Sequence, residues 1–304
     1  MSTLVLARKY RPKTFAQLAG QDHVVKALTH ALESNRLHHA YLFTGTRGVG
    51  KTTVSRILAK SLNCETGITD KPCGVCAVCA DIDAGHFVDY TELDAASNRS
   101  VDEIQQLLEQ AVYKPVQGRF KVFMIDEVHM LTGHAFNAML KTLEEPPPYA
   151  IFILATTEKH KILPTILSRC QIFDFKRITA NDTVQHLEEI CKKEKIKAEK
   201  AALHVIAQKS EGCLRDSLSI LDKIVSFTEG SVTYSNTLEH LNILDEDYFF
   251  KWLNQMQQQQ TADAMLLFDE INQKGFEGDV LLEGRQHVEL HMRPAGRHVE
   301  RGRG

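Results

Sequence analysis

Residues 45–52 read Gly45-Thr46-Arg47-Gly48-Val49-Gly50-Lys51-Thr52. This segment satisfies the phosphate-loop pattern G-x-x-x-x-G-K-[ST] at every fixed position. The apolar run 39–44 before it predicts a buried strand, and residues 52–62 after it predict a helix with one apolar face. A glycine-rich turn can match the pattern by chance, but a strand and a helix in the required places favour a phosphate-binding loop.

The chemistry of this loop follows from its residue types. Glycines allow φ > 0, so the backbone can turn its N–H groups inward, and the helix N-terminus behind them adds partial positive charge. Lys51 is predicted to neutralise the β- and γ-phosphates of a nucleotide, and the Thr52 hydroxyl is predicted to ligate Mg²⁺.

The composition is that of an ordinary globular chain. Its 304 residues, 43% hydrophobic and 25% charged, suit two domains or one domain with additions. A formal net charge of −3 carries no global signature of nucleic-acid binding, so any DNA contact needs a local patch or partner subunits. No apolar run reaches the length of about 18 residues that predicts a membrane span, and the N-terminus lacks the apolar core of a signal peptide. We therefore expect a cytoplasmic protein.

Strand and helix patterns alternate as far as about Lys176. Because such alternation builds parallel sheets, we predict an α/β fold with a mostly parallel sheet. Helical patterns alone follow, which predicts a small helical domain, and a further helical pattern starts near Asp245. After the phosphate loop the predicted strands are 90–93, 121–126, 151–155 and 171–175, and the helices of the small domain are 182–194, 198–209 and 214–228.

A carboxylate pair, Asp126 and Glu127, ends the apolar strand 122–125. Ligands of α/β sheets bind at the C-terminal ends of the strands. Asp126 is predicted to hold Mg²⁺, directly or through water, and Glu127 to activate the attacking water as a general base. The alternative is an acidic turn after a core strand, but the phosphate loop upstream favours hydrolysis.

Four of the seven cysteines lie close together, namely Cys64, Cys73, Cys76 and Cys79. In a reducing compartment such a cluster indicates a metal site rather than disulfides. Four thiolates suit tetrahedral Zn²⁺, closely spaced C-x₂-C-x₂-C also serves iron–sulfur clusters, and free thiols are the third possibility. We favour structural zinc, because no redox partner motif accompanies the cysteines and four exposed thiols would be prone to oxidation.

Two hydroxyl residues and two arginines are less specific signals. Thr156 and Thr157 follow the strand 151–155 beside the carboxylate pair, where a hydroxyl can orient a water or merely finish the strand. Arg169 follows a short predicted helix, and Arg215 lies at the start of a helix in the small domain. Each arginine alone is as readily a solvated surface charge.

Taken together, these motifs resemble a known family. Eight segments match it in order: RKYRP at 8–12, GTRGVGKTT at 45–53, the four-cysteine insertion, VFMIDEVHML at 122–131, LKTLEEPP at 140–147, ATT at 155–157, LSRC at 167–170 and GCLRDSLS at 212–219. The chain closely resembles the γ/τ subunit family of bacterial DNA polymerase III, AAA+ ATPases that drive the sliding-clamp loader. The resemblance runs from about Leu6 to Gly284.

The resemblance implies a division of the chain. Residues 1–178 would form the AAA+ ATP-binding domain, with a zinc module at about 63–80, and residues 179–241 a helical lid. Residues 242–284 resemble the start of a helical collar, whereas residues 285–304 do not resemble the family and are expected to be disordered. With only part of a collar, we expect this chain to bind ATP but to be mostly monomeric or weakly self-associating, with low ATPase activity.

The resemblance also implies roles for single residues. Arg169 would be an arginine finger that reaches the γ-phosphate held by a neighbouring subunit. Arg215 would contact nucleotide from the lid as the sensor-2 residue, and Thr157 would be the sensor-1 residue. Further nucleotide contacts would come from Tyr10, Arg11 and Pro12 around the adenine, Gln21 nearby, and the loop residues Gly45, Thr46, Arg47, Gly48, Val49, Gly50, Lys51, Thr52 and Thr53.

The implied activity is the use of ATP, with Mg²⁺ and a structural Zn²⁺, to open the β sliding clamp and close it around primed DNA. The implied partners are the δ and δ′ subunits, the β clamp, primed DNA and other copies of the chain, with no membrane. Polymerase (nucleotidyltransferase) activity would belong to the complex, because no segment here resembles a polymerase active site.

Two other functions remain as alternatives. The first is a non-hydrolysing structural subunit such as δ′, which the intact Lys51, Thr52, Asp126 and Glu127 disfavour. The second is another AAA+ motor, such as one acting on Holliday junctions, which the cysteine insertion and the SRC segment disfavour.

Overall fold

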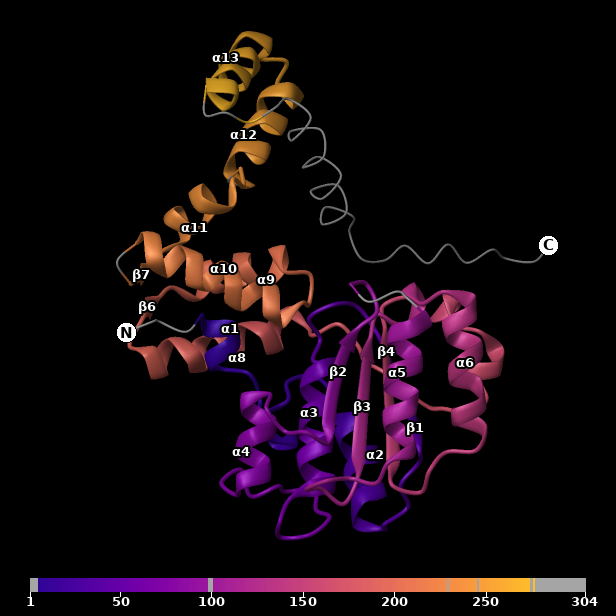
Figure 1. The fold of residues 1–304 in the computed structure, drawn as a ribbon. Coiled ribbons are helices and arrows are strands. Elements are labelled where there is room, and N and C mark those ends of the chain that lie inside the picture. Colours follow the sequence, from indigo (N-terminus) through magenta and orange to yellow (C-terminus); the bar gives the residue numbers. More distant parts are fainter. Residues whose placement is uncertain (1–4, 98–100, 229, 245, 274–275, 277–304) are drawn as a thin grey trace, which may run out of the picture. The chain divides into compact units, whose positions relative to one another are not determined.

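The predicted phosphate-binding loop follows the C-terminal end of a strand in a parallel β-sheet (Figure 1). The computed structural model describes residues 5–97, 101–228, 230–244, 246–273 and 276, and within these ranges the sheet has five strands in the order β2-β3-β4-β1-β5. Every pairing is parallel, which confirms the expected sheet. The strands are β1 (Ala40–Thr44), β2 (Tyr90–Asp94), β3 (Lys121–Asp126), β4 (Ala150–Thr156) and β5 (Gln171–Asp174).

Burial explains the composition of the strands. The central strands β1, β3 and β4 are buried along almost their whole length, which suits the near-continuous apolar runs of parallel strands covered on both faces. The edge strands β2 and β5 vary in exposure along their length instead. The register pairs Thr44 with Thr156 and Asp94 with Asp126. The polar residues that end these strands therefore lie along one edge of the sheet.

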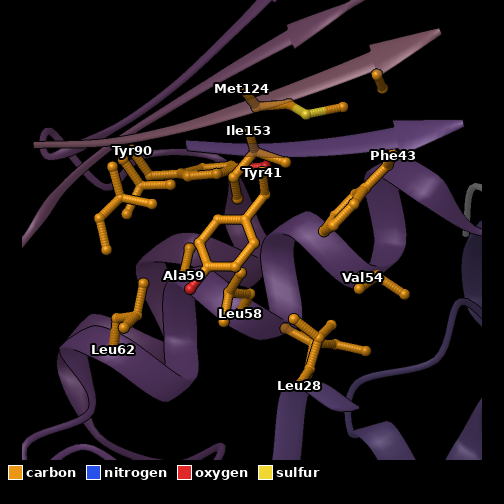
Figure 2. Packing of buried hydrophobic residues seen from close by; sticks show 14 of the residues in the cluster. Leu28, Tyr41, Phe43, Val54, Leu58, Ala59, Leu62, Tyr90, Met124 and Ile153 are labelled. Atoms are coloured by element: carbon orange, nitrogen blue, oxygen red, sulfur yellow. The ribbon is translucent and has the colours of Figure 1, made fainter. Parts of the chain in front are cut away.

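Helices cover both faces of the sheet. On one face, Leu28, Val54 and Leu58 pack against side chains of the central strands, among them Tyr41 and Phe43 (Figure 2). On the other face, two helices cover the side chains that alternate with these along the same strands. The covering helices are α2 (Asp22–Glu33) and α3 (Lys51–Asn63) on the first face, and α5 (Val101–Val112) and α6 (Gly133–Glu144) on the second.

Short elements join the larger ones and carry several of the predicted site residues. One of them begins with Pro164, a residue that is tolerated in the first turn of a helix because the N–H there has no intrahelical acceptor. The short elements are α1 (Leu6–Lys9), η1 (Phe15–Gln17), α4 (Ala77–Ala84), η2 (Val128–Met130), η3 (Lys159–Lys161) and α7 (Pro164–Leu167).

The predicted helical region follows the sheet. Its first helix begins two residues before the predicted range because Thr179 caps it, accepting a hydrogen bond from the backbone N–H of Asp182. The helices α8, α9 and α10 pack together, and α1 packs on α10. Their bounds are α8 (Ala180–Glu194), α9 (Lys200–Lys209) and α10 (Leu214–Phe227), with the short strands β6 (Lys197–Ala198) and β7 (Ser231–Val232).

The chain divides into two compact units, Met1–Ser231 and Val232–Gly304. The described part of the second unit is helical, with a small core of Leu244, Phe249 and Ile271. Its helices are α11 (Tyr234–Leu241), α12 (Glu246–Gln257) and α13 (Thr261–Gln273). The predicted tail 285–304, and residues 277–284 of the predicted collar fragment, lie outside the described residues. None of the helices in the described ranges has the length and apolar content needed to cross a bilayer.

Candidate functional site

The loop between β1 and α3 has a shape that requires glycine at two positions. Gly45 has φ 144°, and a Cβ there would lie 2.5 Å from the carbonyl oxygen of Phe175. Gly48 has φ 70°, and a Cβ there would lie 2.1 Å from the sulfur of Cys213. The 13-residue helix α3 begins at Lys51, within the motif itself, so its unpaired N–H groups and its dipole face the same space. This arrangement favours an anion.

Lys51 places a buried cation inside the loop. The residue is 6% exposed, and its Nζ donates hydrogen bonds to the carbonyl oxygens of Gly45 (2.8 Å) and Thr46 (3.0 Å). Burial lowers the pKa of Lys51, an effect that the nearby Asp126 and Glu127 carboxylates oppose. A buried ammonium on neutral carbonyls gains strongly from an anionic ligand, because charge-assisted hydrogen bonds are the stronger kind.

Thr52 and Asp126 meet at the start of α3 and the end of β3. The Thr52 hydroxyl donates to Oδ2 of Asp126 at 2.9 Å. Oδ1 of the same carboxylate accepts from the backbone N–H of Glu127. A hydroxyl and a carboxylate side by side are hard oxygen ligands of the kind that suit Mg²⁺ bound together with phosphates. These two residues therefore fit the predicted metal.

Glu127 and Thr157 are brought together from the ends of β3 and β4. One oxygen of Glu127, Oε2, accepts from the Thr157 hydroxyl (2.9 Å) and from the Thr157 backbone N–H (3.3 Å). Glu127 has φ 47°, a left-handed conformation that residues other than glycine adopt rarely and that concentrates at functional sites. The two residues form one contact although 30 positions separate them.

His129 completes this group and was not anticipated from the sequence. Its side chain is 5% exposed. Nδ1 lies 3.4 Å from Oε2 of Glu127 and 3.0 Å from the Thr156 hydroxyl, and Nε2 lies 3.2 Å from a Glu158 carboxylate oxygen. The imidazole therefore ties the residues after β3 to the residues that end β4. The available signal was its place two residues beyond Glu127, inside the segment VFMIDEVHML.

A cavity of about 980 Å³ collects most of the predicted nucleotide contacts. Burial lowers the pKa of Arg11, and the positive charges of Arg56 and Arg215 lower it further. A cavity that gathers cations in this way suits a polyanion. The predicted residues that line it are Tyr10, Arg11, Pro12, Arg47, Gly48, Val49, Gly50, Lys51, Thr52, Thr53, Asp126, Glu127 and Arg215.

The helical region is in direct contact with the phosphate loop. Cys213 and Arg215 both lie at the start of α10, where Cys213 is the N-cap residue. Cys213 is the residue that a Cβ on Gly48 would strike, and Arg47 pairs with Asp216 at 3.0 Å. Loop and helix are thus in van der Waals and ionic contact.

Five of the residues predicted for this site are not among those that line the cavity, namely Gln21, Gly45, Thr46, Thr157 and Arg169. The buried amide of Gln21 binds the backbone of Lys176 through both of its ends, at 2.7 and 3.2 Å. Arg169 pairs with Glu144 at 2.5 Å and donates to the carbonyl oxygen of Thr165 at 2.6 Å. Its side chain is 31% exposed.

The four clustered cysteines meet between α3 and α4. Their sulfur atoms all lie within 4.8 Å of one another. Backbone N–H groups donate from Cys73 to the sulfur of Cys64 (3.4 Å), from Cys76 to that of Cys73 (3.3 Å) and from Cys79 to that of Cys76 (3.4 Å). Burial raises the pKa of Cys64, but hydrogen bonds from Thr66 and Cys73 outweigh it and lower this pKa to about 6. Four close sulfurs that accept N–H bonds fit a tetrahedral thiolate site.

Comparison with known proteins adds the family. A family model described as "DNA polymerase III, delta subunit" matches residues 20–179, and one described as "DNA polymerase III clamp loader subunit, ATPase lid domain" matches residues 182–230. DNA polymerase III subunit gamma of Buchnera aphidicola subsp. Acyrthosiphon pisum is 42% identical over 93% of this chain and 78% of its own length. The chain belongs to the DNA polymerase III gamma/tau family.

The lengths within the gamma/tau family differ. DNA polymerase III subunit tau of Escherichia coli K12 is 48% identical over 93% of this chain, but the match covers 44% of that subunit. The chain thus spans less than half the length of this tau subunit and more than three quarters of the Buchnera gamma subunit.

Solved structures show the fold of the gamma/tau chain independently. The Thermotoga maritima RuvB Holliday junction branch migration motor matches with a TM-score of 0.57 at 20% identity, over 81% of this chain and 79% of its own. At that identity the likeness concerns the fold alone. It confirms the expected α/β fold with a parallel sheet, while the much higher identity to gamma and tau subunits separates this chain from a RuvB-type motor.

Proposed function

We propose that this chain binds ATP with Mg²⁺ in the cavity over the phosphate loop and hydrolyses it as the motor subunit of a DNA polymerase III clamp loader. The observation that carries this proposal is the convergence of Lys51, the Thr52–Asp126 pair and the Glu127–Thr157 pair at one edge of the sheet. A cation for phosphates, oxygen ligands for a metal and a carboxylate for water are the parts that ATP hydrolysis requires.

Each part has one task. Lys51 and the N–H groups of the loop bind the β- and γ-phosphates, and Thr52 and Asp126 hold Mg²⁺, which neutralises charge that develops on the phosphates. Glu127 orients the attacking water and accepts its proton, and Thr157 holds Glu127 through Oε2. Arg215 adds positive charge from the lid side, and Tyr10 to Pro12 border the part of the cavity assigned to the adenine.

Arg169 serves a neighbouring subunit in this proposal. Its absence from the residues lining its own chain's cavity, and its partly exposed place on Glu144, support action in trans. An arginine of this kind stabilises charge in the transition state of phosphoryl transfer. Other copies of the chain, δ and δ′ are the proposed neighbours, and the β sliding clamp and primed DNA are the proposed substrates of the assembly.

The remaining assignments belong to the same proposal. We assign residues 1–178 to the ATP-binding domain, 179–241 to the lid and 242–284 to a collar fragment. Polymerase activity is assigned to the complex and not to this subunit, and the cytoplasm is the proposed location. The cysteine cluster is assigned a structural zinc, supported by the geometry of the four sulfurs.

The deciding experiment is an ATPase assay with and without β clamp, δ, δ′ and primed DNA. We expect turnover to rise when all are present, and Lys51→Ala to abolish tight nucleotide binding. The exposed Lys26→Ala, on α2, is the matched control and should bind as the parent does. Nucleotide binding without hydrolysis under any condition would point to a δ′-like structural subunit. Stimulation by four-way DNA junctions alone would point to a branch-migration motor.

Elemental analysis tests the metal assignment. We expect about one zinc per chain after purification under reducing conditions, with Zn–S distances of about 2.3 Å by X-ray absorption. Replacement of Cys73 and Cys76 by serine should abolish zinc retention, whereas serine at the separate Cys191 should leave it unchanged. Iron in place of zinc, or no metal in freshly purified protein, would contradict the assignment.

A further inference from the structure

Lys60 is a buried cation of the first compact unit. Its side chain is 1% exposed, and it lies on α3, the helix that follows the phosphate loop. Its Nζ donates to Oδ1 of Asp83 at 2.7 Å and to the backbone carbonyl oxygen of Lys13 at 2.9 Å. A buried charge is tolerated only with such partners, so both contacts constrain the groups that make them.

Asp83 lies on α4, the helix whose N-terminal end carries two of the clustered cysteines. Cys76 is the N-cap of α4, and its sulfur accepts from the N–H of Cys79. Asp83 follows Cys79 by four residues, one helical turn along the same face. A helix of eight residues has little stability of its own. The position of Asp83 therefore depends on how firmly the cysteine cluster holds the N-terminal end of α4.

Lys13 directly follows the segment assigned to the adenine. Its carbonyl follows directly on Tyr10, Arg11 and Pro12. Lys13, Lys60 and Asp83 all line the 980 Å³ cavity, and Ala84 and Gly85 at the C-terminal end of α4 line it as well. The C-terminal end of α4 thus forms part of the cavity wall, and Lys60 joins it to the backbone that would border the base.

We propose that the four-cysteine module positions the nucleotide pocket, through the chain of contacts Asp83 to Lys60 to the carbonyl of Lys13. With the metal bound, the module fixes α4 and Asp83; Asp83 fixes Lys60; and Lys60 holds the segment 10–13 against the cavity. This inference rests on the proposed binding of ATP in that cavity. It gives the metal a task in nucleotide affinity although none of the four clustered cysteines is among the described residues that line the cavity.

The first test compares variants at Asp83. Asp83→Asn should weaken binding of a fluorescent ATP analogue (N-methylanthraniloyl-ATP) about tenfold, a typical effect of losing a supporting contact outside the site itself. Asp83→Glu keeps the carboxylate and should recover most of the affinity. Asp81→Asn removes the same charge from the same helix without touching Lys60, and should bind as the parent does. Circular dichroism should show the same secondary structure in all four proteins.

The second test combines the variant with metal removal. Stripping the metal from the parent should weaken nucleotide binding about as much as Asp83→Asn does, and Zn²⁺ should restore it. In the Asp83→Asn protein, stripping should add less than about twofold, because both changes act through one contact chain. Multiplied effects of the two changes would show that metal and Asp83 act independently, which would overturn the inference.

A third measurement needs no nucleotide. Amide hydrogen exchange of a peptide covering residues 6–18 should become faster in the metal-stripped parent and in Asp83→Asn, but not in Asp81→Asn. If the parent binds nucleotide and the folded Asp83→Asn protein matches it in affinity and exchange, the inference is wrong and the proposed function stands. If the parent binds no nucleotide, the proposed function fails, while the exchange of residues 6–18 still decides whether the module positions them.

Discussion

Lys51 and Arg169 are cations of the same compact unit with opposite surroundings. Lys51 is 6% exposed and lies inside the cavity, on the carbonyls of its own loop. Arg169 has a side chain that is 31% exposed and pairs with Glu144 outside the lining of that cavity. In the proposed function, Lys51 acts on the nucleotide of its own chain, whereas Arg169 acts on the nucleotide of a neighbouring subunit. That proposal therefore divides the hydrolysis reaction between two separate surfaces of the chain.

The largest expected effect tests this separation. Arg169→Ala should reduce ATP turnover of the assembled clamp loader about 10³-fold, because a finger stabilises charge in the transition state. Nucleotide affinity of the isolated subunit should stay unchanged. Assemblies made from a mixture of Arg169→Ala and Lys51→Ala chains should recover part of the turnover, since each supplies what the other lacks. An equal loss of affinity in the isolated Arg169→Ala chain would place this residue in its own site.

Glu127→Gln should have the next largest effect. We expect turnover to fall at least about 10²-fold while nucleotide affinity is kept, because glutamine keeps the shape but accepts no proton. Steady-state kinetics and a binding titration on the same protein separate the two quantities. Glu145→Gln, an exposed carboxylate near the end of α6, is the control and should leave both unchanged. Parent-level hydrolysis by Glu127→Gln would remove Glu127 from the role of base.

His129→Asn should act more weakly and only on kcat. The buried imidazole contacts Glu127 and Thr156, so its loss should leave Glu127 less well oriented and lower kcat about tenfold. KM for ATP should change less than about twofold, because His129 is not among the residues that line the cavity. His134→Asn, exposed on α6, controls for the loss of a histidine. A rise in KM with kcat unchanged would show that His129 supports binding and not the orientation of Glu127.

Glu144→Gln should have the smallest effect. The Arg169–Glu144 pair is substantially exposed, and surface ion pairs contribute less than about 1 kcal/mol to stability. The midpoint of urea unfolding should therefore hardly move, and turnover of the assembled loader should stay within about threefold of the parent. A loss of turnover as large as that of Arg169→Ala would show that Glu144 is needed to aim the arginine.

The part of the site that could be predicted from the sequence consists of residues that lie close together in the chain. The phosphate loop and the pair Asp126–Glu127 each lie within one short segment, so residue types and neighbouring strand patterns were enough to find them. The parallel sheet followed from alternating patterns in the same way. Local patterns of this kind reflect the periodicity of single elements and not the packing between them.

Contacts that depend on packing between distant elements could not be predicted in this way. His129 matters because β4 lies beside β3, which brings Thr156 and Thr157 to its ring and to Glu127. The amide of Gln21 is satisfied by the backbone of Lys176, 155 positions away. In the sequence Lys60 is an ordinary lysine of a predicted helix. Its burial and its two hydrogen bonds depend on the packing of α4 and the N-terminal segment against α3. Strand order and helix packing decide such contacts, and neither can be predicted from the pattern of a short segment.

The packing of Gly48 against Cys213 has a consequence for how this protein can vary. Gly48 occupies a place in the G-x-x-x-x-G-K-[ST] pattern where any residue is formally accepted. Here a single carbon added at position 48 would overlap the sulfur of Cys213. The substituted residue would also have to keep the left-handed backbone conformation of Gly48, with φ 70°. Substitutions at positions 48 and 213 are therefore linked by volume: a side chain at position 48 requires a smaller residue at position 213, whereas Gly48 has no side chain whose removal could make room for a larger residue at 213. The motif accepts any residue at position 48, but in this chain Cys213, 165 residues further along, leaves room for glycine alone.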